Sequence, residues 1–241
     1  MYRLCILLLT LLSAAASADT DVVLQGDEIL YNGPLTREAN SKVSKLYEAA
    51  ESKPTVLAIT SAGGPVDVGL QLGEWILSKG LNVKVEEFCF SSCANYVFPA
   101  GKTKLLGGSA VVGFHGGAFS KDYNRSQIEE VLSSIPQEDR EAVREQIRVS
   151  LEKYLSENRE REAEFYRKLG VSPKLNILGQ DSKYSAYHTA GYNGWYYSPD
   201  DMSKLGLKDI VIIGGEWKPE TWTGEYRLFR AVVGAPTPKT D

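Results

Sequence analysis

A serine, a histidine and a pair of glycines are the residues of this chain best suited to chemistry. Acyl transfer needs a nucleophile, a base that takes its proton, and N–H donors that stabilise the oxyanion. Ser92 lies where a strand-like segment passes into a short apolar helix, so its hydroxyl can project from a turn. His115 follows an apolar run that ends at Phe114. These positions favour Ser92 as nucleophile and His115 as general base.

Backbone amides are the predicted oxyanion donors. Gly63 and Gly64 follow a strand-like run, and without side chains they can bring N–H groups close to a bound carbonyl. The amide of Cys93 lies at a helix start, where N–H groups have no intrahelical partner. Each signal also has an ordinary structural reading, because glycine pairs form turns, serines cap helices, and a histidine after a strand can serve packing alone.

Hydrophobic periodicity predicts the elements that position these residues. Residues 55–60 form an almost continuous apolar run, typical of a strand buried on both faces of a parallel sheet. A helix over 66–79 and a strand over 82–88 complete one β-α-β unit, and such sheets bind ligands beyond the carboxyl ends of their strands. Further elements are expected at 22–24, 28–31, 35–52, 102–105, 110–114, 199–206 and 208–213.

A charged segment interrupts this pattern. Residues 126–169 are rich in Glu, Arg, Lys and Leu and contain no glycine, and Pro136 divides them into one short and one long predicted helix. The alternating charges indicate a solvated helix face more simply than a binding surface. We therefore expect a helical insertion at about 122–170, and a C-terminal tail at about 214–241 with a hairpin around Thr223-Gly224.

The N-terminus indicates export. A basic residue, a short apolar run over 4–12 and an Ala-x-Ala site predict a signal peptide over 1–18, with a mature domain over 19–241. The alternative is an uncleaved anchor, although the run is shorter than the roughly 20 residues that a membrane span needs. We expect a periplasmic or secreted protein with no stable membrane span after cleavage. In that compartment Cys89 and Cys93 are expected to form a disulfide, with two buried thiols as the alternative.

Composition limits the partners. The formal net charge is −4 with both signs interspersed, and no basic stripe points to nucleic acid. The chain has two histidines, His115 and His188, and neither shows metal-ligand spacing with the cysteines. We therefore expect no metal and no cofactor.

Four segments, in order across about residues 55–213, resemble the Clp protease proteolytic subunit. They are Ile59-Thr60-Ser61-Ala62-Gly63-Gly64-Pro65-Val66, Ser92-Cys93-Ala94 with Ala100-Gly101, Val112-Gly113-Phe114-His115, and Ser198-Pro199-Asp200-Asp201-Met202 with Gly206-Leu207-Lys208-Asp209. The resemblance implies an α/β chain with a Clp protease/crotonase-like fold of repeated β-β-α units. It implies a serine hydrolase, a peptidase, acting on peptide or protein. Ser92 keeps the family's offset to Ala-Gly, and Ser91 is the rival nucleophile.

Departures from the family pattern keep alternatives open. Where the family has its third catalytic acid, this chain reads Tyr192-Asn193-Gly194-Trp195, without a carboxylate. Asn193 can orient a histidine, as asparagine does in some cysteine proteases. The alternatives to Asn193 are Asp181 or no third member at all. His188 is the alternative to His115 as the base. The tyrosine-rich stretch 184–197 reads either as a packed connection or as a substrate groove.

Export also separates the chain from cytoplasmic ATP, unfoldases and acyl-CoA. An ATP-independent enzyme is therefore expected, and an acyl-CoA enzyme is disfavoured. The competing hypothesis is a catalytically weak or inactive fold that binds a peptide or an envelope protein. Assembly of several copies through the charged helices also stays open.

Overall fold

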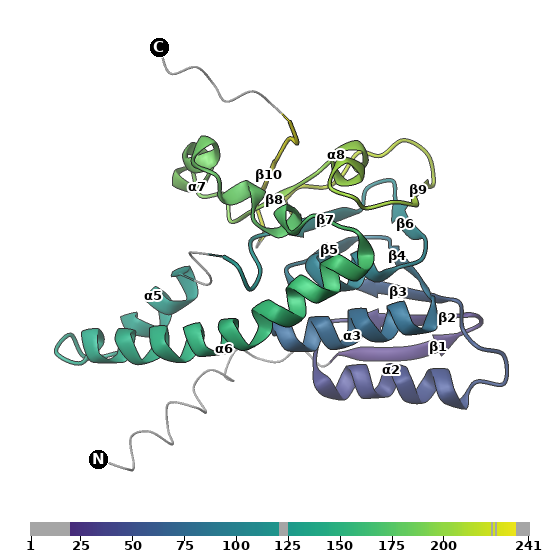
Figure 1. Cartoon of the computed structure of the whole chain (residues 1–241), viewed down its shortest axis with the longest axis horizontal. Coiled ribbons are helices and arrows are strands. Elements are labelled where there is room, and N and C mark those ends of the chain that lie inside the picture. The colour runs from purple at the N-terminus through teal and green to yellow at the C-terminus, as the bar shows by residue number, and fades with distance from the viewer. Residues whose placement is uncertain (1–19, 121–124, 223, 225, 235–241) are drawn as a thin grey trace.

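Apolar segments of this chain form the strands of two β-sheets at the centre of the molecule (Figure 1). The structure is a computed structural model that describes residues 20–120, 125–222, 224 and 226–234. The predicted signal peptide, residues 1–18, lies outside the described residues. The chain is a mixed α/β protein, as its sequence pattern indicates.

The larger sheet has six strands in the order β1-β2-β3-β4-β6-β9. β1 and β2 form an antiparallel hairpin, and every other pair in this sheet is parallel. Its strands are β1 (Asp21–Gln25), β2 (Glu28–Asn32), β3 (Val56–Thr60), β4 (Asn82–Val85), β6 (Lys104–Gly107) and β9 (Ile210–Ile213). The first four residues of β3 are buried, as expected for a strand covered on both faces.

The smaller sheet has four strands in the order β10-β8-β7-β5. β5 and β7 are parallel, β7 and β8 antiparallel, and β8 and β10 parallel. The strands are β5 (Phe88–Phe90), β7 (Val111–Phe114), β8 (Gly194–Tyr196) and β10 (Leu228–Arg230). β10 comes from the predicted C-terminal tail, so part of that tail belongs to the sheet. A bridge between Trp222 and Arg227 forms where the hairpin was expected.

The prediction of one strand over 82–88 is wrong. β4 ends at Val85 and β5 begins at Phe88, in the other sheet. The exposed residues Glu86 and Glu87 lie at the bend between them. The two glutamates also break the alternation of Val83 and Val85 before Phe88, so the sequence carries a signal for the bend although not for the change of sheet. A bridge between Ser61 and Cys89 joins the end of β3 to β5.

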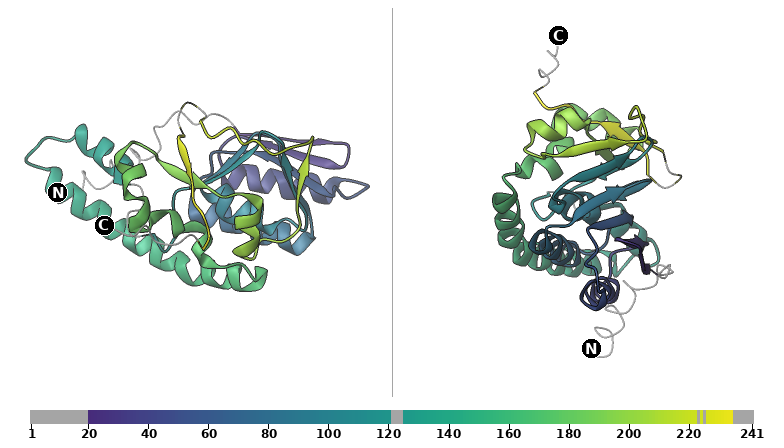
Figure 2. Two further views of the ribbon diagram at one scale, coloured as in Figure 1. Left: turned by 90° about the horizontal axis from the view of Figure 1, so that it is seen from above. Right: turned by 90° about the vertical axis from the view of Figure 1, so that its right-hand side faces the viewer.

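Helices cover the sheets, and Figure 2 shows α3 and α6 on the same side of them. The helices are α2 (Arg37–Ala49), α3 (Val66–Lys79), α4 (Phe98–Ala100), α5 (Arg125–Ser133), α6 (Arg140–Leu169), α7 (Ser185–Thr189) and α8 (Pro199–Lys204). A π-helical turn, η1 (Cys93–Val97), precedes α4. Short 3-10 turns lie at Pro173–Asn176, Leu178–Gln180 and Ser182–Tyr184. In Figure 1, α5 and the first turns of α6 extend beyond the sheets.

Two glycines bring α3 against η1. A Cβ on Gly69 would lie 2.8 Å from the Cβ of Ser92, and a Cβ on Gly73 would lie 2.5 Å from the backbone oxygen of Tyr96. Any larger residue would push the two helical segments apart, so this close contact fixes the segment that follows β5.

Among the described residues, no helix is both long enough and apolar enough to cross a membrane.

Candidate active site

Ser91 and His115 form the hydrogen-bonded pair of this site. Ser91 follows β5 and His115 follows β7, and because these strands are parallel neighbours their carboxyl ends meet at one edge of the sheet. The Ser91 N–H donates to the Gly113 oxygen at 2.9 Å, which continues the ladder past the end of β5. The Oγ of Ser91 and the Nε2 of His115 are 2.6 Å apart. This is the contact that a nucleophile and its general base need.

The backbone of Ser91 has a conformation that is rare for serine. Its φ is +55°, in the left-handed region. Such a conformation in a residue other than glycine costs about 1–3 kcal/mol and persists where the surrounding structure enforces it. Here the Asn95 N–H donates to the Ser91 oxygen at 2.8 Å, so the chain turns from β5 directly into η1. A strained strand-to-helix turn is also the setting in which α/β-hydrolases present their nucleophile.

Ser92 has a different partner from the one its sequence position suggested. Its Oγ donates to the Gly64 oxygen at 2.7 Å, and the residue is only 1% exposed. The left-handed turn at Ser91 directs the two adjacent hydroxyls apart, one to His115 and one to the glycine loop. The predicted pair of Ser92 and His115 is therefore corrected to Ser91 and His115, which makes Ser91, the rival in the sequence reading, the candidate nucleophile.

The glycine loop lies directly against the serines. Gly63 has φ +92°, and a Cβ there would lie 2.7 Å from the Ser91 Cβ and 2.9 Å from the Ser92 nitrogen. Only glycine allows this approach. The Gly63 N–H donates to the Oγ of Ser61 at 3.1 Å, so this amide already has a partner inside the protein. The loop thus places its backbone beside Ser91, while Gly63 itself is a weaker oxyanion donor than predicted.

A disulfide brackets the candidate nucleophile. Cys89 in β5 and Cys93 at the start of η1 are bonded, with their Cα atoms 5.3 Å apart, and both are fully buried. The bond closes a loop around Phe90, Ser91 and Ser92. It therefore ties together the two ends of the strained turn.

His115 is held through its own backbone and that of the next residue. Gln180 donates through Nε2 to the His115 oxygen at 3.3 Å, and Asn95 donates through Nδ2 to the Gly116 oxygen at 2.6 Å. Burial lowers the pKa of the His115 imidazole from its ordinary value of 6.5. The ring is therefore neutral at neutral pH, which is the form that can accept a proton from Ser91.

Contacts are also seen for Asn193 and Asp181, the predicted third members, and for His188, the alternative base. The Oδ1 of Asn193 accepts the Arg227 N–H at 2.8 Å, where the C-terminal segment joins β8. His188 contacts the Gly179 oxygen through Nε2 at 2.9 Å. Asp181 caps a 3-10 turn, where its backbone oxygen accepts the Tyr184 N–H at 2.9 Å.

The tyrosine-rich stretch packs around one side chain. Tyr184, Tyr187, Tyr192 and Trp195 all contact the ring of Phe229, which is 2% exposed. This arrangement favours a packed connection. Tyr187 alone of these residues is largely open to solvent, at 42%.

A buried acid that the sequence reading missed joins the two halves of the site. Glu162 in α6 is fully buried. Its Oε2 accepts the Tyr96 hydroxyl at 2.5 Å and the Ala118 N–H at 2.9 Å, and its Oε1 accepts Nδ2 of Asn176 at 3.1 Å. Tyr96 belongs to the segment after Ser91, and Ala118 to the loop after His115. Glu162 thus positions both segments relative to each other.

The signal for Glu162 was present in the sequence. The buried residues of α6 recur at helical spacing and are Leu155, Asn158, Glu162, Phe165 and Tyr166. Abundant charge on the other faces of the helix concealed this stripe, and polar members within it weakened the apolar pattern.

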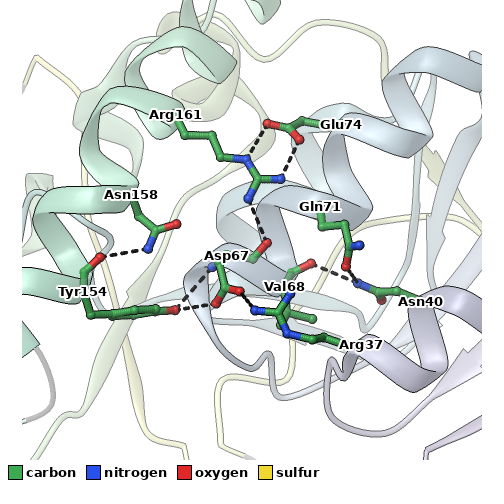
Figure 3. Close-up of polar contacts among 9 residues, drawn as sticks. All are labelled: Arg37, Asn40, Asp67, Val68, Gln71, Glu74, Tyr154, Asn158 and Arg161. Carbon is green, nitrogen blue, oxygen red and sulfur yellow. Dashed lines mark hydrogen bonds and ion pairs between the residues drawn. The ribbon is translucent and has the colours of Figure 1, made fainter.

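A polar network attaches α6 to the start of α3, as Figure 3 shows. The hydroxyl of Tyr154 donates to Oδ1 of Asp67 at 2.8 Å, and Asp67 also pairs with Arg37 of α2. Arg161 binds Glu74 through two N–H groups, at 2.8 and 2.6 Å. Because α3 begins directly after the glycine loop, this network holds the loop's far end.

No protein-family model matches the chain, and a search of curated proteins finds no match. Among the described residues no group of three or more His, Cys, Asp or Glu side chains could hold a metal ion. The assignment of function therefore depends on the geometry of the site.

Proposed function

We propose that this protein is an exported, ATP-independent serine hydrolase that cleaves peptide bonds, with Ser91 as nucleophile and His115 as general base. The observation that carries the proposal is the 2.6 Å contact between Ser91 Oγ and His115 Nε2 at a strained strand-to-helix turn. The ordered motifs that resemble the Clp protease proteolytic subunit support a serine hydrolase, although their spacing matches Ser92, and the two-sheet architecture is compatible with an α/β fold.

The chemistry follows from the pair. Neutral His115 accepts the proton of Ser91 through Nε2 while Oγ adds to the substrate carbonyl carbon. Backbone N–H groups near Ser91 stabilise the oxyanion. Gly64 and Cys93 are the predicted donors, and the Ser92 amide, which lies against the glycine loop, is a further candidate. His115 then gives its proton to the leaving amine as the tetrahedral intermediate collapses. Water, deprotonated by His115, hydrolyses the acyl-enzyme and restores the Ser91 hydroxyl.

Ser92 has a supporting role in this proposal. Its hydroxyl holds the Gly64 oxygen at 2.7 Å and so sets the orientation of the peptide group beside the nucleophile. Ser91→Ala and Ser92→Ala are therefore a matched pair of variants, because they differ by one position and one contact.

The test is labelling by a fluorophosphonate, which reacts with activated serines. We expect wild type to be labelled at Ser91, Ser91→Ala to show no labelling, and Ser92→Ala to be labelled more slowly. Peptide mapping by mass spectrometry identifies the modified residue. Labelling at Ser92, or unchanged labelling of Ser91→Ala, contradicts the assignment.

The low exposure of Ser91, 9%, favours a second candidate function. In that case the chain is an inactive fold that binds a peptide or an envelope protein. The labelling assay distinguishes the two candidate functions. An unperturbed histidine loses its proton between pH 6 and pH 9. A folded wild-type protein that stays unlabelled throughout this range supports binding alone.

Export is part of the proposal and has its own test. The buried disulfide fits an oxidising compartment. The mature chain is expected to begin at Asp19, and intact mass of the protein purified from the envelope fraction or medium measures this. A chain that keeps residues 1–18 contradicts it.

A further inference from the structure

A hollow on the far edge of the larger sheet has the features of a ligand site. It has a volume of about 290 Å³ and lies where β6 and β9 begin and where α3 and α6 end. Ser61, which joins β3 to the strand of Ser91, lies at the opposite, carboxyl end of these parallel strands. The hollow is therefore separate from the Ser91–His115 site and lies outside the proposed hydrolytic chemistry.

Lys104 is the unusual residue in the wall of this hollow. It is 7% exposed, and in the described part of the chain its Nζ has no hydrogen bond and no carboxylate within ion-pair distance. Lys84, on the adjacent strand, shows the ordinary arrangement, with its Nζ 2.6 Å from Glu28 and 3.5 Å from Glu86. Burial of an ammonium without a partner is unfavourable. Desolvation accordingly lowers the pKa of Lys104, against a smaller opposing effect of Asp209.

The charges around Lys104 increase the need for an anion. Lys102 and Lys208 line the same hollow, and of the described residues in its wall Asp209 alone is acidic. The carboxyl ends of α3 and α6 supply partial negative charge, which attracts lysines generally. At these ends the N–H groups of Leu81 and Val171 donate to the oxygens of Ile76 and Tyr166, at 3.3 and 3.1 Å. Among the described residues no helix-end carbonyl accepts a hydrogen bond from the Nζ of Lys104, so the helix ends give the buried ammonium no direct partner.

The rest of the wall is apolar. Side chains of Leu77, Pro99, Leu169 and Val171 line the hollow, with Ala100 and glycine backbone between them. A site with one cationic end and aliphatic walls selects a molecule that has an anionic group on a short apolar chain. A volume near 290 Å³ is at the small end of ligand pockets, so the occupant has few carbon atoms.

We propose that this hollow binds a small organic carboxylate, whose anionic group pairs with Lys104 and whose alkyl chain contacts Leu77 and Leu169. Lys102 and Lys208 at the rim attract the anion, and the buried ammonium fixes its position.

Hexanoate is the probe, with hexanamide as its uncharged analogue, and isothermal titration calorimetry is the measurement. Hexanoate is expected to bind wild type saturably, and about tenfold or more tightly than hexanamide, since the amide lacks the charge that pairs with Lys104. Lys104→Met is expected to weaken hexanoate binding at least about tenfold, while Lys42→Gln on the exposed face of α2 leaves it unchanged.

The stability of Lys104→Met gives a second readout. Because methionine has a similar length and no charge to bury, the variant is expected to fold and to unfold at the same or a higher urea concentration than wild type. The proposal is overturned if wild type does not bind hexanoate and Lys104→Met is strongly destabilised. That result would mean that the ammonium of Lys104 is stabilised by the helix ends. Binding of inorganic phosphate without binding of hexanoate also overturns it, since the apolar walls then select nothing.

Discussion

Replacing Glu162 tests whether α6 holds the two halves of the candidate site together. In Glu162→Ala the Ala118 N–H and the Nδ2 of Asn176 lose their acceptor in a fully buried place. A buried donor without a partner costs about 1–3 kcal/mol, so two of them give a loss of about 3 kcal/mol in the free energy of unfolding. The cavity left by the side chain adds to this loss.

Glu162→Gln is the matched control because it keeps the shape. The amide oxygen can take the place of Oε2 and accept from Tyr96 and Ala118. The new amide nitrogen then faces Asn176, whose buried Oδ1 has no hydrogen-bond partner among the described residues. Rotation of the Asn176 amide brings that oxygen to the new donor, so the side chain loses no hydrogen bond. We expect Glu162→Gln to stay within about 1 kcal/mol of wild type.

Urea unfolding followed by circular dichroism measures both variants, with the m-value as a check that the same surface unfolds. Fluorophosphonate labelling of the folded fraction reports the site, and its rate is expected to fall in Glu162→Ala more than in Glu162→Gln. If Glu162→Ala lowers the stability by less than about 1 kcal/mol, or if Glu162→Gln is equally damaging, the positioning role is refuted.

Four further predictions concern His115, the disulfide and a glycine of α3. The rate of Ser91 labelling is expected to fall as the pH is lowered, with a midpoint under 6.5, because only neutral His115 accepts the proton. A midpoint at or above 6.5 contradicts the lowered pKa. The free energy of unfolding is also expected to fall at low pH. The pKa of His115 is lower in the folded than in the unfolded chain, so the unfolded chain binds the extra proton and stability falls as the pH drops from 6.5 through the folded pKa. Urea titrations at several pH values measure this change. The double variant Cys89→Ala/Cys93→Ala is expected to lose about 2 kcal/mol of stability, the loop entropy of a short crosslink, and a loss below about 0.5 kcal/mol is inconsistent with it. Gly73→Ala is expected to lower the free energy of unfolding in urea by about 1–3 kcal/mol, since its Cβ would lie 2.5 Å from the Tyr96 oxygen. The control Gly80→Ala meets nothing within 4 Å and is expected to cost about 1 kcal/mol from its left-handed backbone. Equal costs for the two variants contradict the packing argument.

The sequence by itself determined the elements whose signals are local. The expected helix over 66–79 is α3, from Val66 to Lys79, and its end at Gly80 follows from the left-handed conformation that glycine adopts most easily. The expected strand over 55–60 is β3, because a continuous apolar run has few alternatives to a doubly covered strand. The hydroxyl of Ser198 caps α8 through the Asp201 N–H, as its position before Pro199 indicates. The cysteine pair forms the expected disulfide.

Tertiary structure decided which residues meet. The choice between Ser91 and Ser92 depends on one backbone angle, +55° at Ser91, and neighbouring serines carry no sequence signal for it. The division of residues 82–88 between two sheets depends on which strands lie beside them, because Glu86 and Glu87 mark the bend but not the sheet that each half joins. Burial of Glu162 depends on α6 lying across the segments that contain Tyr96 and Ala118. A residue pattern records which face of an element avoids water, whereas the partner that covers this face is fixed only when distant segments pack.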